Sequence, residues 1–239
     1  MNSRFEGKVA LVAGGTGGLG RAVTLAFFEE GATVVVTYRR QEELDALKIA
    51  AGAAAGRLEA FAIDVTDEAA VRQLIEKILA KHRRLDAVVN TVGGYAGGMK
   101  LWELETKVFD QMLALNLRSG YALSRAVVRP MLKQGHGSIV NVASKAALDH
   151  AAGAAAYAAS KAAAVAMIDS LAADLQGTGV RVNSILPSII DTEANRRAMP
   201  KADFSKWPKP QDIARVILFL CSEEAKVIHG AAIPVFGDS

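Results

Sequence analysis

The chain has very little cysteine and no long apolar run. Its one cysteine, Cys221, excludes a disulfide within the chain and leaves no cysteine cluster for zinc. Because Cys221 follows the apolar run 216–220, we interpret it as a small core residue rather than a reactive thiol. No apolar run approaches the roughly 18 residues that a membrane-spanning helix requires, so we expect no membrane partner.

Blocks of like charge are also absent. The 28 basic and 25 acidic residues give a net charge of +3 and do not gather in a basic stretch, which argues against a nucleic-acid partner. The four histidines, His82, His136, His150 and His229, have no metal-ligand spacing, so we expect no metal. Residues 1–8 are polar and unlike a signal peptide, and we expect a soluble cytoplasmic protein.

What the chain does have is a regular alternation of strand and helix patterns. Short apolar, β-branched runs predict strands, and the segments between them have helical periodicity. The predicted strands are 9–13, 33–37, 58–63, 87–90, 138–142, 180–186 and 231–235. The predicted helices are 18–30, 41–51, 67–82, 105–134, 156–176 and 211–222.

Such alternation predicts an α/β fold. About half of the 239 residues are apolar, which suits a single large domain over 1–239. We predict a Rossmann-like, doubly wound parallel sheet of about seven strands with helices on both faces. Ligands of such sheets bind at the carboxyl ends of the strands. The longest irregular stretch, about 187–210, is interpreted as a substrate lid.

A glycine-rich loop joins the first strand to the first helix. Gly14, Gly18 and Gly20 permit a tight turn and a close approach of the backbone to a pyrophosphate at the helix N-terminus. The alternative is a plain turn, because glycine-rich turns are common. The candidate dinucleotide contacts in this loop are Gly14, Thr16, Gly17, Gly18, Leu19 and Gly20.

The loop resembles that of the short-chain dehydrogenase/reductase family, T-G-x-x-x-G-x-G, with Ala13 in place of the threonine. That replacement removes one side-chain hydrogen bond of the loop. Asn90-Thr91-Val92-Gly93 resembles the family motif N-N-A-G, and only its asparagine and final glycine are kept. The resemblance covers nearly the whole chain. It implies that Asp64 and Val65 contact the adenine and that Asn90 and Gly93 belong to the cofactor site.

A candidate catalytic group follows from the same resemblance. Tyr157 and Lys161 form a Y-x-x-x-K motif, whose spacing places both side chains on one helix face. Ser144 lies thirteen residues before the tyrosine, as in the family, and Asn116 matches the fourth catalytic position. The alternative for each residue is ordinary packing or surface exposure. The resemblance implies that Tyr157 and Lys161 also bind the cofactor, with Lys161 on the nicotinamide ribose.

The chemistry of these residues suits reduction of a carbonyl. Hydride addition to the carbonyl carbon leaves an alkoxide that needs a proton. A tyrosine has an ordinary pKa of about 10, and we expect the ammonium of Lys161 to bring the pKa of Tyr157 toward neutrality. Ser144 can donate a hydrogen bond to the developing oxyanion. By the resemblance, Asn116 positions a water that links Lys161 to solvent.

The segment after the sixth strand resembles the family pattern P-G-x-x-x-T. Here Pro187 begins the pattern, Ser188 replaces the glycine and Thr192 ends it. The resemblance implies that Ile190 and Thr192 contact the carboxamide of the cofactor, with Pro187 beside them. The alternative is a plain loop.

The residues that end the second strand bear on the choice of cofactor. NAD-binding proteins place an acid there for the ribose 2′-hydroxyl, whereas this chain has Tyr38, Arg39 and Arg40. Arg39 occupies the position where the family's NADP-dependent members keep an arginine for the 2′-phosphate. We therefore predict that NADP(H) is preferred and that NAD(H) is possible. The alternative is that both arginines are simply solvated.

Residues 92–98, 145–149 and 191–207, on the lid and substrate side, resemble one branch of the family, the quinonoid dihydropteridine reductases. Two features depart from that branch, because Ser144 replaces its alanine and no acid follows the second strand. We therefore predict a carbonyl reductase or alcohol dehydrogenase, with reduction of a quinonoid pterin as the alternative. The candidate substrate-pocket residues are Tyr95, Trp102, His150, Phe204 and Trp207, each of which has packing as its alternative.

Two further expectations concern the assembly and a non-enzymatic role. The resemblance implies a homodimer or homotetramer, built on the predicted helices 105–134 and 156–176. A sensor that binds a dinucleotide without chemistry is the other class of function. The presence of both Tyr157 and Lys161 argues against such a sensor, because proteins of that kind usually lose one of them.

Overall fold

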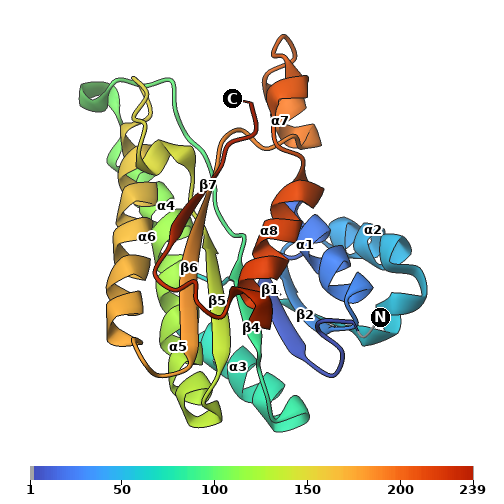
Figure 1. Cartoon of the computed structure of the whole chain (residues 1–239). Coiled ribbons are helices and arrows are strands. Elements are labelled where there is room, and N and C mark those ends of the chain that lie inside the picture. Colours follow the sequence, from blue (N-terminus) through green and yellow to red (C-terminus); the bar gives the residue numbers. More distant parts are fainter. Residues whose placement is uncertain (1–2, 239) are drawn as a thin grey trace.

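Seven parallel strands form one sheet in the order β3-β2-β1-β4-β5-β6-β7 (Figure 1). The computed structural model describes residues 3–238. The strands are β1 (Val9–Ala13), β2 (Thr33–Tyr38), β3 (Leu58–Ala62), β4 (Ala87–Asn90), β5 (Gly137–Val142), β6 (Val180–Pro187) and β7 (Ala232–Val235). All neighbouring strands pair in parallel, so Leu11 of β1 lies between Val35 of β2 and Val88 of β4. This sheet confirms the predicted doubly wound α/β fold.

Helices connect the strands and cover both faces of the sheet (Figure 1). The α-helices are α1 (Gly18–Glu29), α2 (Gln41–Ala51), α3 (Glu68–His82), α4 (Thr106–Leu113), α5 (Ser119–Gln134), α6 (Ala155–Asp174), α7 (Glu193–Ala198) and α8 (Pro210–Cys221). Short 3₁₀ segments lie at Gly52–Arg57, Leu101–Glu103, Lys145–Ala147, Phe204–Lys206 and Glu223–Ala225. Among the described residues, no helix is long and apolar enough to cross a membrane.

The two faces of the sheet bury separate apolar cores, because successive side chains of a strand point to opposite faces. Ala10 and Val12 of β1 pack in one core with side chains of α1, α2 and α8. Val9 and Leu11 pack in the other core with side chains of α3, α5 and α6. The sheet is therefore the middle of three layers, which explains why its strands are nearly continuous apolar runs.

The chain reverses its direction of winding between β1 and β4. From β1 the strands run outward to β2 and β3, and the chain then returns to the other side of β1 through β4. The loops after β1 and β4 consequently diverge at the carboxyl edge of the sheet. A crevice at this point is where doubly wound sheets bind ligands.

The predicted helix 105–134 is interrupted. It consists of α4, a π-helical segment Ala114–Arg118 and α5. Turns of this wider kind are rare and often occur at functional sites. The segment contains Asn116, whose buried side chain bonds to the loop after β4 rather than facing solvent. Helical periodicity did not reveal the interruption, because the residues on either side of it are ordinary helix formers.

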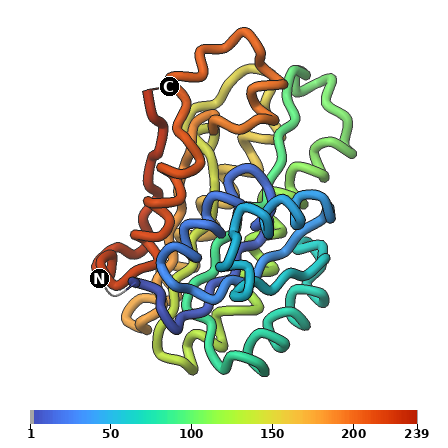
Figure 2. The backbone as a smooth tube through the Cα atoms, turned by 90° about the vertical axis from the view of Figure 1, so that its right-hand side faces the viewer, coloured from blue at the N-terminus to red at the C-terminus, as the bar shows by residue number. Residues whose placement is uncertain are grey.

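The predicted irregular stretch 187–210 also contains regular structure. Thr192 caps α7, since its side-chain oxygen accepts a hydrogen bond of 3.2 Å from the backbone N–H of Asn195. The end of the chain braces this segment, because Asp238 donates from its backbone to the carbonyl of Lys206 at 3.1 Å. Figure 2 shows the C-terminal segment running up to the lid region. The stretch therefore has a short helix and a fixed base, and its role as a lid stays a prediction.

Candidate active site

A groove with a cavity of about 210 Å³ lies at the carboxyl edge, where β1 and β4 diverge. It is lined by the glycine loop, by the ends of β2 and β4 and by residues that follow β3. Eight predicted cofactor residues line it: Gly14, Thr16, Gly17, Tyr38, Arg39, Asp64, Val65 and Gly93. Residues from four separate strand ends thus meet where the fold predicts a ligand.

The glycine loop has the conformation that its residues predict. Gly14 has φ +74°, a conformation that side chains disfavour. A Cβ at Gly20 would lie only 2.0 Å from the carbonyl oxygen of Gly14. Gly17, the residue before α1, has no side chain to cap the first N–H groups of that helix. The loop and the helix N-terminus therefore fit a pyrophosphate, for which glycine-lined backbone N–H groups are suitable partners.

Thr91 provides the side-chain hydrogen bond that Ala13 cannot. Its hydroxyl donates to the carbonyl oxygen of Ala13 at 2.7 Å and lies 3.2 Å from that of Gly14. The family motif has asparagine at position 91, so two departures from the family pattern compensate one another. The sequence shows that positions 13 and 91 both depart from the family pattern, but it does not show that these two residues are in contact.

Two predicted cofactor residues instead have buried side chains with internal roles. Leu19, in the first turn of α1, packs its side chain in the core. Asn90 is 3% exposed and donates hydrogen bonds to Ser119 at 3.2 Å and Asn141 at 3.0 Å. Only the backbone atoms of these two residues are therefore available to contact a cofactor. The Asn90 side chain instead links β4 to β5 and to α5.

The end of β2 places Tyr38 and Arg39 in the groove, whereas Arg40 is exposed and pairs with Glu43. Hydrogen bonds from the backbone and the hydroxyl of Thr66 lower the pKa of Asp64, and the charge of Arg39 acts in the same direction. Glu43 also lines the groove, although no sequence pattern singled it out. It lies in the first turn of α2, which brings its carboxylate back toward the glycine loop.

The four candidate catalytic residues come from three neighbouring elements. Ser144 follows β5, Tyr157 and Lys161 lie on α6, and Asn116 lies in the π-helical segment. The Lys161 ammonium donates to the carbonyl oxygen of Val142 at 3.0 Å and lies 6.0 Å from the centre of the Tyr157 ring. Their arrangement suits proton transfer beside the groove.

The pKa of Tyr157 differs from our expectation. Burial raises the pKa of Tyr157, and the neighbouring Tyr95 adds to this effect, while a hydrogen bond with Ser144 opposes it. Lys161 does not produce the expected lowering, because its ammonium bonds to Val142 rather than to the phenol. Burial lowers the pKa of Lys161 to about 8. The surroundings of the phenol in this fold therefore favour its protonated form.

Asn116 holds the loop that follows β4. Its side chain accepts a hydrogen bond from the backbone N–H of Gly94 and donates to the Gly94 carbonyl, both at 3.0 Å. It also donates to the Ser160 hydroxyl at 3.0 Å. A Cβ at Gly93 would lie 2.9 Å from the Asn116 side-chain oxygen and 3.2 Å from the Lys161 nitrogen. The side chains of Asn116 and Lys161 therefore both lie close to Gly93.

The segment after β6 reaches back to the glycine loop. A Cβ at Gly18 would lie 2.8 Å from the methyl group of Thr192, so these two predicted cofactor residues are in contact. Pro187 ends β6 opposite Val235, and Ile190 packs at the edge of the core. Thr192 therefore lies against the start of α1.

The candidate substrate residues divide into two groups. The Tyr95 ring meets the Tyr157 ring edge-on, with their centres 5.0 Å apart, and is 69% exposed. Trp207 is buried and packs on Phe204, so these two residues form the interior of the lid segment. Trp102 is exposed and stacks with Lys100, and His150 is exposed before α6. Tyr95 is the candidate that directly touches a predicted catalytic side chain.

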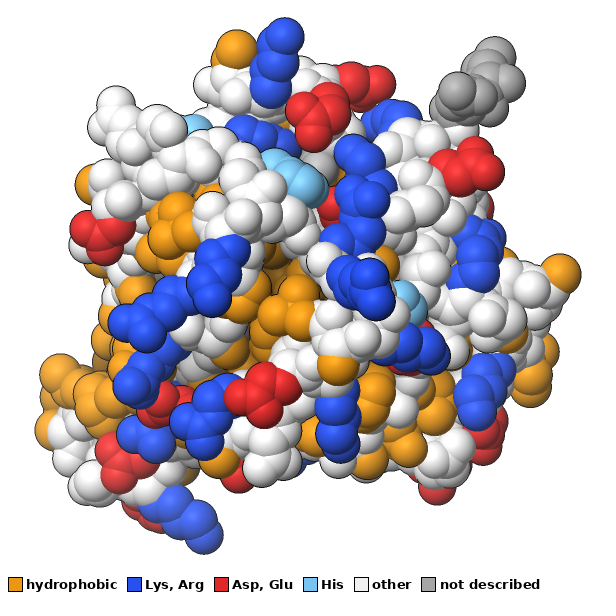
Figure 3. Space-filling view, turned by 90° about the horizontal axis from the view of Figure 1, so that it is seen from below, with side chains coloured by type: hydrophobic (Ala, Val, Ile, Leu, Met, Phe, Trp, Pro, Cys, Tyr) orange, Lys and Arg blue, Asp and Glu red, His pale blue; other side chains and the backbone are white. Residues whose placement is uncertain are grey.

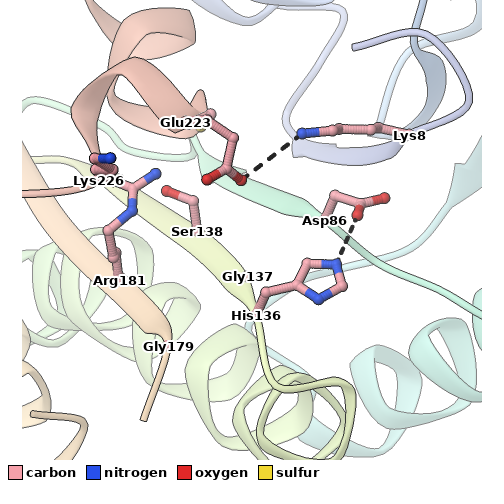
Figure 4. A pocket seen from close by; sticks show the side chains of 10 residues that line it. Lys8, Asp86, His136, Gly137, Ser138, Gly179, Arg181, Glu223 and Lys226 are labelled. Atoms are coloured by element: carbon pink, nitrogen blue, oxygen red, sulfur yellow. Dashed lines mark hydrogen bonds and ion pairs between the residues drawn. The ribbon is translucent and has the colours of Figure 1, made fainter. Parts of the chain in front are cut away.

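A second cavity, of about 220 Å³, lies at the opposite, amino edge of the sheet (Figure 4). Two side-chain pairs lie in its lining, Lys8 with Glu223 at 3.9 Å and His136 with Asp86 at 3.2 Å. Figure 3 views this end of the molecule, where basic and acidic side chains are interspersed. Among residues 3–238, no cluster of His, Cys, Asp and Glu could hold a metal.

Comparison with known proteins identifies the family. A family described as short chain dehydrogenase matches residues 8–203. The chain belongs to the short-chain dehydrogenase family. It is 34% identical to the 3-oxoacyl-(acyl-carrier-protein) reductase of Thermotoga maritima over 242 residues, with 98% of each chain covered. It is 36% identical to D-threitol dehydrogenase of Mycolicibacterium smegmatis, with 98% of this chain and 93% of the other covered.

A solved structure agrees with this assignment. The structure of ElxO with NADP bound is similar with a TM-score of 0.90 and 27% identity, over 96% of this chain and 97% of the other. These comparisons confirm the predicted family and the predicted class, an oxidoreductase. The relatives are named for reduction of an oxo group and for oxidation of an alcohol, and they do not favour the pterin alternative.

Proposed function

We propose that this chain interconverts a carbonyl and an alcohol, with NADP(H) preferred, NAD(H) possible and Tyr157 as the acid or base. The observation that carries the proposal is the meeting of Ser144, Tyr157 and Lys161 beside the glycine-lined groove. A bound nicotinamide dinucleotide would supply or accept the hydride. The residues that line the groove fit the rest of such a cofactor.

Each protein group then has a definite task. The Ser144 hydroxyl donates a hydrogen bond to the substrate oxygen, whose negative charge grows as the carbonyl is reduced. Tyr157 donates the proton that turns this oxygen into a hydroxyl. The raised pKa of Tyr157 suits the acid role, because the phenol carries its proton at neutral pH. Lys161 would hold the nicotinamide ribose of a bound dinucleotide. In the reverse direction Tyr157 acts as the base.

Arg39 supports the choice of NADP(H). It lines the groove at the end of β2, where the 2′-phosphate of a bound dinucleotide would lie. A guanidinium matches phosphate in shape and charge. The solved relatives with NADP bound agree with this choice.

The test is a steady-state assay of NADPH consumption with a panel of ketones, aldehydes and a quinonoid dihydropterin. We expect turnover with one or more carbonyl compounds and a loss of about 10²-fold in kcat for Ser144→Ala, because one oxyanion donor is removed. Turnover of the pterin alone, unaffected by Ser144→Ala, would contradict the proposal. NADH is assayed in parallel to measure the preference.

We also propose that the chain acts as a homodimer or homotetramer. Phe109 of α4 and Tyr121 and Leu132 of α5 are exposed aromatic or aliphatic side chains on the predicted interface helices. Burying them between two copies would remove apolar surface from water. Light scattering during size-exclusion chromatography gives the molar mass, and a monomeric mass would contradict this proposal.

A further inference from the structure

Glu43 is an acidic side chain in the groove that we assign to the dinucleotide. It lines the same cavity as Thr16, Tyr38 and Arg39. The Thr16 hydroxyl donates to one of its carboxylate oxygens at 3.0 Å, and the other oxygen pairs with Arg40. The Glu43 side chain is 27% exposed, so its charge is only partly screened by water. Two opposite charges, Arg39 and Glu43, thus face one cavity.

Two residues from neighbouring segments, Thr16 and Arg40, hold the Glu43 side chain in place. Thr16 belongs to the glycine loop, Arg40 directly precedes α2 and Glu43 lies in the first turn of α2. The hydrogen bond from Thr16, which is 6% exposed, fixes the carboxylate against the loop. Arg40 is held by the same carboxylate on the outer side. Glu43 therefore places a negative charge in the cavity and engages one of the two arginines that end β2.

We infer that Glu43 is a specificity-determining residue that limits the affinity of the groove for a 2′-phosphorylated dinucleotide. This inference rests on the proposed cofactor site. The 2′-phosphate carries a charge of about −2 and is attracted by Arg39, but the carboxylate in the same cavity repels it. The carboxylate also competes with the phosphate for Arg40. A 2′-hydroxyl brings no such charge and can donate a hydrogen bond to a carboxylate.

The consequence is a smaller discrimination between NADPH and NADH than the two arginines alone would give. Removing the charge of Glu43 leaves Arg39 unopposed and releases Arg40. Glutamine at this position keeps an oxygen for the Thr16 hydroxyl, so the loop retains its support. The Glu43→Gln substitution therefore removes the negative charge while it keeps an acceptor for the hydrogen bond from Thr16.

The experiment measures the dissociation constants of NADPH and NADH by titration calorimetry for the wild-type chain and Glu43→Gln. We expect NADPH to bind about tenfold more tightly to Glu43→Gln, an effect of the size of one charge pair near a protein surface. NADH should bind equally or more weakly. Steady-state KM values for the two cofactors should change in the same ratio. High salt should reduce the difference, because it screens charge.

Glu42→Gln is the matched control. Glu42 lies in the same first turn of α2, is exposed and is outside the lining of the cavity. The Glu42→Gln substitution removes an equal charge from the same helix end. We expect the ratio of NADPH to NADH affinity in this variant to stay at the wild-type value. An equal shift in Glu42→Gln would mean that net charge alone is responsible, which would overturn the inference.

Two further outcomes separate the inference from the proposed function. If the wild-type chain binds both cofactors and Glu43→Gln leaves their ratio unchanged, the inference fails and the proposed function stands. The same holds if both cofactors weaken equally, because Glu43 would then only support the loop. If the folded wild-type chain binds neither cofactor, the proposed function fails and the inference fails with it.

Discussion

The buried charged groups at the two edges of the sheet have different kinds of hydrogen-bond partner. At the amino edge Asp86 is nearly buried and accepts hydrogen bonds from Arg84 at 2.6 and 2.8 Å and from the backbone N–H of Val9 at 2.8 Å. At the carboxyl edge the buried ammonium of Lys161 donates one hydrogen bond, to the carbonyl of Val142. Asp86 therefore has an opposite charge as partner, whereas Lys161 donates to a neutral carbonyl group.

This difference appears in the direction of each pKa shift. Burial alone would raise the pKa of Asp86, but Arg84, Val9 and His136 together hold it below its ordinary value. Burial of Lys161 is not balanced in this way and lowers its pKa to about 8. The folded state thus favours the charged form of Asp86 and disfavours the charged form of Lys161. The charge of Asp86 therefore stabilises the fold, while the charge of Lys161 destabilises it.

The largest expected effect concerns activity at the carboxyl edge. Tyr157→Phe removes the proposed proton donor and keeps the ring, so we expect kcat to fall by about 10³-fold, with little change in the dissociation constant of the cofactor. Turnover and cofactor titration measure the two quantities. Unchanged turnover would contradict the role of Tyr157. The matched control is Tyr121→Phe, at an exposed position of α5 outside the lining of the groove, and its kcat should stay at the wild-type value.

The second effect concerns stability at the amino edge. Asp86→Ala leaves Arg84 and the N–H of Val9 without their partner, and we expect the free energy of unfolding to fall by about 3 kcal/mol. Because the pKa of Asp86 is lowered in the folded state, its contribution is present at neutral pH and is lost only in acid. Urea unfolding measures the change.

The control for Asp86 is Asp169→Ala, at an exposed position of α6, which should change the free energy of unfolding by less than about 0.5 kcal/mol. The kcat of folded Asp86→Ala should remain at the wild-type value. A large loss of kcat with normal stability would show that the amino edge takes part in catalysis and would break the contrast between the two edges.

The third effect tests the destabilising charge of Lys161. The pKa of Lys161 falls from its ordinary 10.5 to about 8 on folding. Between these values the unfolded chain binds more protons, so this group raises stability as pH increases from about 8 to 10.5. Below pH 8 its burial opposes folding by about 3 kcal/mol. Lys161→Met should therefore abolish turnover and yet stabilise the fold at pH 7 by about 2 kcal/mol, after the loss of one hydrogen bond.

The measurement compares urea unfolding of the wild-type chain and Lys161→Met across this pH range. The gain in Lys161→Met should be greatest below pH 8 and should shrink toward pH 10.5, since the wild-type lysine is then neutral. A variant that is less stable at pH 7, or a gain that does not depend on pH, would show that Lys161 is not a destabilising buried charge.

The smallest expected effect concerns Cys221, which borders the amino-edge cavity. Burial raises the pKa of its thiol to about 12, so the thiolate that reacts with alkylating reagents is scarce in the folded chain. Iodoacetamide should label the unfolded chain much faster than the folded one, with no loss of turnover in the folded sample. Rapid labelling of the folded chain would reveal that the amino edge opens.

The elements that the sequence predicted well are those whose signals are local. Apolar periodicity placed every strand, and five of the seven strands differ from the prediction by a single residue at one end. The glycine spacing predicted the turn after β1, because a positive φ at Gly14 is a property of that residue alone. The spacing of Tyr157 and Lys161 predicted a shared helix face, since helical geometry fixes it.

The features that it did not predict depend on residues distant in the chain. The helix is interrupted at the segment that contains Asn116, whose side chain bonds to Gly94, 22 residues away. Glu43 enters the groove through a hydrogen bond to Thr16, 27 residues away. The direction of the pKa shift of Tyr157 depends on burial and on Tyr95, neither of which the motif itself contains.

By itself the sequence determined the order of strands and helices, the glycine turn and the residues available for chemistry, because each follows from local backbone geometry or from side-chain type. Only the tertiary structure decided how those residues are charged and where they meet. Packing the layers buries the Lys161 ammonium against the Val142 carbonyl, surrounds Asp86 with partners and places Glu43 and Arg39 in one cavity. Burial and proximity are properties of the folded chain, and they set the electrostatics on which the proposed chemistry depends.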